Sequence, residues 1–261
     1  MIHPSGEQYG LSFEAQRATI VEVGGGLRTY EVGEREVLDG YGIDELCGSG
    51  RGQVLAPWPN RVAGGVYSFD GEEHRLALTE PAAGNAIHGL ARWACWRAAE
   101  REPERVVMEH VLHPQPGYPF TLRLRVEYRL GAGGLTVSTT AENAGGRPCP
   151  FGVGHHPYIA APTGRVDDFV VDGELLGAQK LDDTRRMDAP WRMQIDDVTV
   201  WADESWKHVQ VFTGDPLPDV ARRSFAVEPM TCPPNAFRTG EDLIRLEPGE
   251  SFTGVWGITL A

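Results

Sequence analysis

The segment GVGHHPYI, residues 152–159, places two adjacent histidines between glycines and a Pro-Tyr pair. In an extended chain neighbouring side chains point to opposite faces, so His155 and His156 cannot both bind one metal ion unless the strand bulges. The sequence also lacks the HExxH spacing of a helical zinc site. We therefore expect no metal site here, and we expect chemistry from one histidine of the pair.

His156 is the better candidate because of its neighbours. It shares its face with Gly152 and Gly154, which have no side chains and are expected to leave room for a ligand beside the imidazole. His155 shares its face with apolar residues and is expected to point into a packed core. An imidazole titrates near neutral pH, so His156 is suited to proton transfer.

A buried carboxylate is predicted at Glu228, which follows the strand-like segment SFAV and precedes a Pro-rich loop. Burial raises the pKa of a carboxyl group towards the range in which it works as a general base. The sequence leaves a second interpretation open, in which Glu228 lies at a rim and pairs with an arginine.

Further polar residues lie beside Trp and Pro in PWPNRVAGG, residues 57–65, and in NAIHGLARWACW, residues 85–96. His88 is either an active-site group or a turn residue that hydrogen-bonds to backbone. Arg61 is either a bidentate donor to an oxygen-rich ligand or a clamp for a carboxylate. Asn60 and Trp93 are further candidates in the same two segments.

Period-two alternation predicts the strands that must position these groups. Apolar and polar side chains alternate in TLRLRVEYRL, residues 121–130, and GAGG then leads into a second alternating segment, which predicts a hairpin. Asp70-Gly71 and Pro248-Gly249 are each expected to separate two further strands. No window shows a helical apolar period, and 32 Gly with 19 Pro would interrupt most helices. The predicted fold is all-β, an antiparallel sandwich or barrel.

The organisation of the chain is expected to be simple. Its 261 residues show no internal repeat, no low-complexity tract and no linker, so residues 1–261 are predicted to form one domain. The least strand-like segment, residues 173–197, carries many charges and is expected at a sheet edge or over a cleft.

Composition limits the partners. The 24 Lys+Arg and 37 Asp+Glu give a formal charge of −13, which disfavours nucleic acid and anionic membranes and favours a neutral or cationic small molecule. The four cysteines form no CxxC pair and are expected to be reduced thiols. We see no signal-peptide pattern and no apolar run near the roughly 18 residues of a membrane span, so a cytoplasmic location is expected. No feature of the sequence indicates an oligomeric state.

Four segments together resemble a known family. PWPNRVAGGVYSFDG, AIHGLARW, GVGHHPYI and AVEPMTCPPNAF occur in the order of the signature segments of the aldose 1-epimerases, also called galactose mutarotases. The resemblance covers nearly the whole chain. It implies a large antiparallel β-sandwich of the galactose mutarotase-like type, and a cofactor-independent interconversion of the α and β anomers of a free sugar.

The resemblance also implies roles for individual residues. Glu228 matches the general base, His156 the general acid and His88 the second active-site histidine, while Arg61 matches an arginine that binds sugar hydroxyls. The base is expected at the C1 hydroxyl and the acid at the ring oxygen, on opposite sides of the sugar. The other expected substrate contacts are Asn60, Asp182 and Trp93.

One segment departs from the family pattern. Around residues 172–182 the chain is shorter than the pattern and lacks an Asp-Phe-Arg element. Asp182, in GAQKLDD, is the candidate sugar-binding aspartate, with Asp183 as the alternative and a solvated loop position open for both. The shortening is expected to open one wall of the cleft, and the substrate could therefore differ from a simple hexose.

Three other functions are open at this point. A glycoside hydrolase would pair Glu228 with an aspartate, but its common plan uses two carboxylates and no histidine acid. A carbohydrate-binding pseudoenzyme would keep the pocket without turnover. A sugar-phosphate epimerase would need a cluster of basic residues at the cleft, which the acidic total does not favour.

Overall fold

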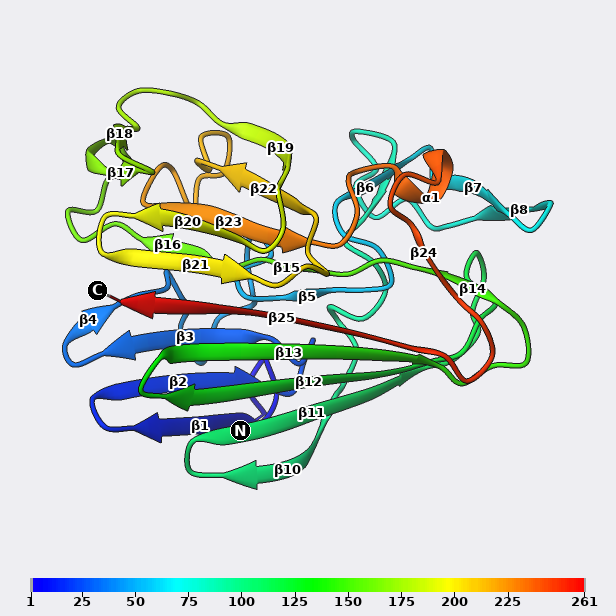
Figure 1. The fold of residues 1–261 in the computed structure, drawn as a ribbon, viewed down its shortest axis with the longest axis horizontal. Coiled ribbons are helices and arrows are strands. Elements are labelled where there is room, and N and C mark those ends of the chain that lie inside the picture. Colours follow the sequence, from blue (N-terminus) through cyan, green and yellow to red (C-terminus); the bar gives the residue numbers. More distant parts are fainter. Residues whose placement is uncertain (1, 261) are drawn as a thin grey trace.

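Antiparallel strands dominate the computed structural model, which describes residues 2–260 (Figure 1). Within that range the helical elements are α1 (Ala236–Thr239) and a 3-10 helix, η1 (Val166–Asp168). None of the helices in the described chain has the length and apolar character needed to cross a bilayer. The predicted all-β fold is confirmed.

The largest sheet has nine strands, and its centre is the hairpin predicted from the alternating segments. Leu122 pairs with Asn143 and Leu130 with Leu135, and alternate residues from Leu122 to Leu130 are buried because one face of the hairpin covers the core. In spatial order the strands are β10 (Arg97–Glu102), β11 (Arg105–Leu112), β12 (Leu122–Gly131), β13 (Gly134–Asn143), β25 (Ser251–Leu260), β21 (Val198–Ala202), β20 (Trp191–Ile195), β17 (Val170–Val171) and β18 (Glu174–Leu175).

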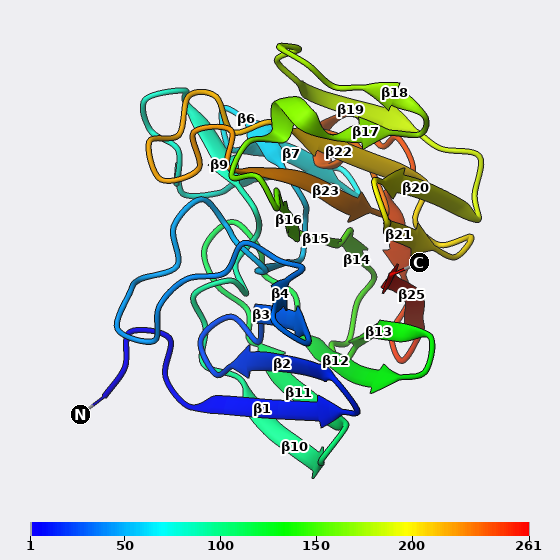
Figure 2. The same cartoon turned by 90° about the vertical axis from the view of Figure 1, so that its left-hand side faces the viewer.

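Two smaller sheets face this sheet, towards opposite ends of the molecule (Figures 1 and 2). The first packs its strands β1 and β2 against β11 and β12 and comprises β1 (Gln8–Phe13), β2 (Gln16–Val21), β3 (Leu27–Val32) and β4 (Arg35–Glu36). The second comprises, in order, β19 (Asp182–Arg186), β22 (His208–Phe212), β23 (Ser224–Met230), β15 (Gly154–His155) and β5 (Val54–Leu55), with β16 (Tyr158–Ala160) also paired to β23.

Three two-stranded pairs complete the fold: β14 (Cys149–Phe151) with β24 (Ile244–Leu246), β6 (Arg61–Ala63) with β9 (Asn85–Ile87), and β7 (Val66–Phe69) with β8 (Glu72–Arg75). The turn predicted at Asp70-Gly71 joins β7 to β8, and both residues have the positive φ, 50° and 82°, that a tight hairpin turn of this type requires. Pro248-Gly249 separates β24 from β25 as predicted, although these two strands belong to different sheets.

Part of the segment 173–197 lies at sheet edges as expected, because β18 ends the nine-stranded sheet and β19 ends the six-stranded one, whereas β20 is an inner strand of the nine-stranded sheet. It contains more strand than expected. In β20 the side chains of Trp191, Met193 and Ile195 alternate with polar ones and are buried. This period-two pattern is visible in the letters WRMQI but is short and surrounded by charges.

One hydrophobic cluster contains buried side chains from Tyr9 to Ile258, which favours the one-domain organisation predicted above. His155 lies inside it, as expected, with its ring centroid 5.6 Å from that of Trp206 and 5.2 Å from that of Trp256. Its Nε2 is 2.8 Å from the hydroxyl of Thr139. Trp256 and Thr139 belong to the nine-stranded sheet, so His155 joins the two layers of the sandwich.

We expect this buried imidazole to make stability depend on pH. Burial lowers the pKa of His155 from 6.5 to about 3, so between these pH values the unfolded chain binds a proton that the folded chain does not. The unfolding free energy of the wild type, minus that of His155→Gln, should therefore rise by about 1.4 kcal/mol per pH unit up to about pH 6.5 and then level off.

Urea denaturation of both proteins between pH 4.5 and 8 measures this difference. Subtracting the unfolding free energy of the variant removes the contributions of other groups. One of these is Glu228, whose raised pKa makes the unfolding free energy fall as the pH rises. A difference that stays constant across the range would show that His155 carries no pH-linked stability.

Candidate active site

A pocket of about 370 Å³, within the size range of small-molecule sites, collects the predicted polar residues. All seven candidates line it: Asn60, Arg61, His88, Trp93, His156, Asp182 and Glu228. Asp183 is not among its lining residues, because neighbouring side chains on the strand β19 point to opposite faces. The structure therefore brings the predicted site together and selects Asp182 over Asp183, while the chemical roles of these residues remain predictions.

Glu228, on β23, is only 3% exposed. Its Oε1 lies 3.4 Å from Nε2 of His156, and its Oε2 is buried without a hydrogen-bond partner. Burial raises the pKa of this carboxyl group well above 4.5, the negative charge of Asp182 raises it further, and Arg61 opposes the shift. The alternative of a rim glutamate paired with an arginine is wrong.

His156 follows β15 and lies among other aromatic rings. It stacks on Tyr158, with ring centroids 4.9 Å apart and planes at 11°, and it forms a T-shaped contact with the ring of His88, with centroids 5.3 Å apart. Burial lowers the pKa of His156 to about 3 and that of His88 well below 6.5. The Nδ1 atom of His88, like Oε2 of Glu228, is a buried polar atom without a partner, and a polar ligand would supply one.

The close contact between His156 and Glu228 corrects one expectation. Atoms 3.4 Å apart leave no space for a sugar ring between them. The expectation that the acid and the base lie on opposite sides of the sugar is therefore wrong. Both groups instead reach the pocket from the same side. They are placed to act together on two oxygen atoms bonded to one carbon.

The role expected for two glycines is also wrong. A Cβ atom on Gly152 would lie 2.5 Å from Sγ of Cys232, and one on Gly154 would lie 2.9 Å from a proline side chain. These glycines admit neighbouring segments of the protein, not a ligand, and neither lines the pocket. The glycine that matters for His156 is Gly50, where a Cβ would approach Cδ2 of the imidazole to 2.8 Å.

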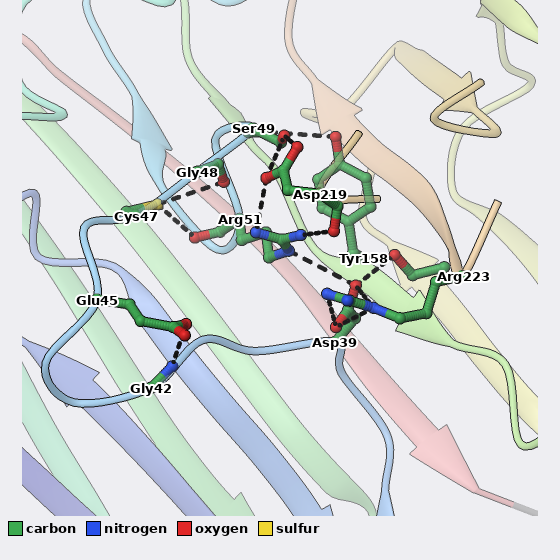
Figure 3. Close-up of polar contacts among 11 residues, drawn as sticks. Asp39, Gly42, Glu45, Cys47, Gly48, Ser49, Arg51, Tyr158, Asp219 and Arg223 are labelled. Atoms are coloured by element: carbon green, nitrogen blue, oxygen red, sulfur yellow. Dashed lines mark hydrogen bonds and ion pairs between the residues drawn. The ribbon is translucent and has the colours of Figure 1, made fainter. Parts of the chain in front are cut away.

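The loop that carries Gly50 is held by a polar network (Figure 3). The hydroxyl of Tyr158 donates to the carbonyl of Ser49 at 3.1 Å, and the hydroxyl of Ser49 donates to Asp219 at 2.8 Å. The guanidinium of Arg51 also donates to Asp219, at 3.0 Å. Because Tyr158 stacks on the active-site imidazole, this network fixes one side of that ring.

Arg61 clamps a carboxylate, which was one of its two predicted roles. Its Nε and one terminal nitrogen donate to the two oxygens of Glu80 at 2.8 and 2.9 Å, and both residues line the pocket. Nearby, the amide nitrogen of His88 donates to the carbonyl of Asn60 at 2.8 Å. These two residues have φ values of 61° and 52°, a left-handed conformation that is often found at functional sites.

The residues that line the pocket come from both strands and loops. Glu228, Asp182 and Arg61 lie in strands, and His156 directly follows one, whereas the rest of the lining comes mainly from loops. Sequence reasoning missed the other lining residues: Cys47, Ser49, Gly50, Glu80, Ile87, Arg92, Tyr158, Gln210, Phe212, Pro216 and Leu217. Ile87, Arg92 and Tyr158 lie within the segments singled out in the sequence, and the others carry no local signal.

Comparisons with known proteins agree on one family. The family model described as aldose 1-epimerase matches residues 7–169. The Escherichia coli K12 protein YihR, which is uncharacterized, is 33% identical over 287 aligned residues that cover 95% of this chain and 92% of YihR. Human galactose mutarotase is 28% identical over 177 residues, which cover 60% of this chain and 49% of that protein. A GalM/aldose epimerase homologue from C. elegans has the same fold, with a TM-score of 0.84 at 14% identity over 98% of this chain and 99% of that one.

Proposed function

Because the chain belongs to the aldose 1-epimerase family, we propose that it interconverts the α and β anomers of a free aldose in the pocket described above. The observation that carries this proposal is the 3.4 Å contact between Glu228 and His156 at the pocket. Anomer interconversion needs a proton acceptor and a proton donor at neighbouring oxygens, and this pair is arranged to supply both.

In the proposed reaction, Glu228 accepts the proton of the C1 hydroxyl while His156 donates a proton to the ring oxygen. The bond between C1 and the ring oxygen breaks, and the open aldehyde forms. After rotation about the C1–C2 bond, the new hydroxyl attacks the other face of C1. The two protons then return, so both side chains regain their starting states.

The pKa shifts of the pair disfavour the charged state that the reaction needs, but that state requires no additional proton. Burial raises the pKa of Glu228 and lowers that of His156, so the empty site favours the neutral acid beside the neutral imidazole. That state and the reactive state, carboxylate beside imidazolium, hold the same single proton. Moving it across the contact creates the reactive state without exchange with solvent, and the reaction itself neither consumes nor releases a proton.

Other pocket residues are proposed to hold the sugar hydroxyls. Asp182 is positioned by Gln210, whose amide donates to its Oδ1 at 2.6 Å, and Arg61 is oriented by Glu80. His88 and Asn60 complete the polar contacts, and the face of Trp93, which is 46% exposed, can cover the apolar side of the ring. We propose that the reaction needs no cofactor and takes place in the cytoplasm.

Polarimetry on freshly dissolved α-galactose and α-glucose tests the function. We expect the approach to anomeric equilibrium to accelerate in proportion to protein concentration. Saturation-transfer NMR on further aldoses extends the test to other sugars. Sugar binding without faster exchange would indicate a carbohydrate-binding pseudoenzyme, and release of a phenol from aryl glycosides would indicate a hydrolase.

A further inference from the structure

Arg92 is a cationic residue of the pocket whose charge is not neutralised. It lines the pocket together with His88 and His156. Within residues 2–260 no carboxylate lies within ion-pair distance of its guanidinium, whereas Arg61 is paired with Glu80. The group that the structure does show against the Arg92 guanidinium is the ring of Trp93, at 5.5 Å.

The backbone at Arg92 is firmly placed. The side-chain amide of Gln53 donates to its carbonyl at 3.2 Å. A Cβ atom on Gly24 would lie only 2.5 Å from the same carbonyl oxygen, so the chain is closely packed here. The backbone that carries the Arg92 side chain is therefore held in place at the pocket, and the guanidinium rests on an aromatic face.

The charges of the pocket are unevenly distributed. The positive charge of Arg92 contributes to lowering the pKa of both His88 and His156, after burial as the main cause, while Asp182 helps to raise the pKa of Glu228. Burial also lowers the pKa of Arg92 itself. A partly desolvated charge without a partner is unfavourable for folding, and such groups are frequent at binding sites.

We propose that Arg92 pairs with an anionic oxygen group on the sugar, so that the preferred substrate is an aldose carrying a carboxylate, sulfate or phosphate away from C1. This inference rests on the proposed function and specifies its substrate class. A guanidinium binds two oxygens of such a group in a planar fork, which a neutral hydroxyl cannot match.

The overall acidity of the chain does not oppose this inference. The formal charge of −13 led to the expectation of a neutral or cationic ligand. Exposed charges more than about 8 to 10 Å away are largely screened at ordinary ionic strength, whereas a partly buried cation at the binding site is not. The local arrangement around Arg92 therefore outweighs the total charge.

The test compares each neutral sugar with its anionic counterpart: galactose with galacturonate and galactose 6-phosphate, and glucose with the corresponding derivatives. For the wild type we expect a higher kcat/KM on one anionic series than on the neutral parent. In Arg92→Gln, kcat/KM for that anionic sugar should fall roughly 10- to 100-fold, mainly through KM, with a much smaller change for the neutral parent. Arg92→Lys, which keeps the charge, should recover part of the loss.

Arg101→Gln is a matched control. Arg101 also lies over an aromatic ring, that of Tyr9 at 5.0 Å, but it lines a different depression of the surface. Its replacement should change neither series. Equal losses for neutral and anionic sugars in Arg92→Gln would overturn the inference, because Arg92 would then bind ordinary hydroxyls.

The two proposals can fail separately. If the wild type accelerates anomer exchange of no sugar, neutral or anionic, the proposed function fails. Saturation-difference NMR of galacturonate and galactose binding then still decides the role of Arg92. Selective loss of galacturonate binding in Arg92→Gln would support the inference, and equal binding by wild type and variant would overturn it.

Discussion

Replacing Glu228 with glutamine should lower kcat for anomer exchange by roughly 10²- to 10⁴-fold, the usual contribution of a general base. Glutamine has nearly the same size but cannot accept the proton of the C1 hydroxyl. Because burial already disfavours the charged carboxylate, the neutral amide should leave the fold intact. The effect should appear in kcat more than in KM, since the amide can still hydrogen-bond to the sugar.

Polarimetry or saturation-transfer NMR measures this change, with circular dichroism as the check on folding. Glu241→Gln provides the control, because Glu241 is exposed and lies outside the pocket, and its replacement is the same chemical change. Anomer exchange at the wild-type rate in Glu228→Gln would remove Glu228 as the base, and with it the observation on which the proposed function rests.

The two adjacent histidines should separate into a catalytic effect and a structural effect. His156→Gln should lower kcat by roughly 10²- to 10⁴-fold, because no group would then donate a proton to the ring oxygen. His155→Ala should instead lower the unfolding free energy by roughly 2 to 4 kcal/mol, since it leaves a cavity between Trp206 and Trp256 and removes the partner of Thr139.

Rates and urea unfolding of the two variants, measured at a temperature at which both are folded, decide the matter. A folded His155→Ala protein without activity would contradict the assignment, as would full activity in His156→Gln. The first result would place the chemistry on the face of His155, and the second would remove His156 as the proton donor.

Much of the fold was predictable because alternation along one strand is a local property. The hairpin β12–β13, the turn at Asp70-Gly71 and the opposite directions of His155 and His156 all follow from the letters of short segments. The edge positions of β18 and β19 followed from the charge of residues 173–197, but the inner strand β20 within this segment was underestimated.

The site was predictable only in part, because its details depend on residues distant in sequence. The space beside Gly152 is filled by Cys232, which no local pattern reveals. Arg61 finds its carboxylate in Glu80, and Asp182 is separated from Asp183 only by the direction of a strand whose pairing with β22 the sequence does not show. The more open cleft wall expected from the shortened segment remains a prediction.

The division of the pocket between strands and loops has a consequence for how this protein can change. Glu228 and His156 are held by strands packed on the core, so most substitutions around them would disturb folding. Arg92, Trp93, Pro216 and Leu217 come from loops, where replacements leave the strand register untouched. Substitutions that adapt the protein to a new sugar should therefore accumulate in these loops, both after gene duplication and in laboratory evolution. The reaction itself should be inherited unchanged.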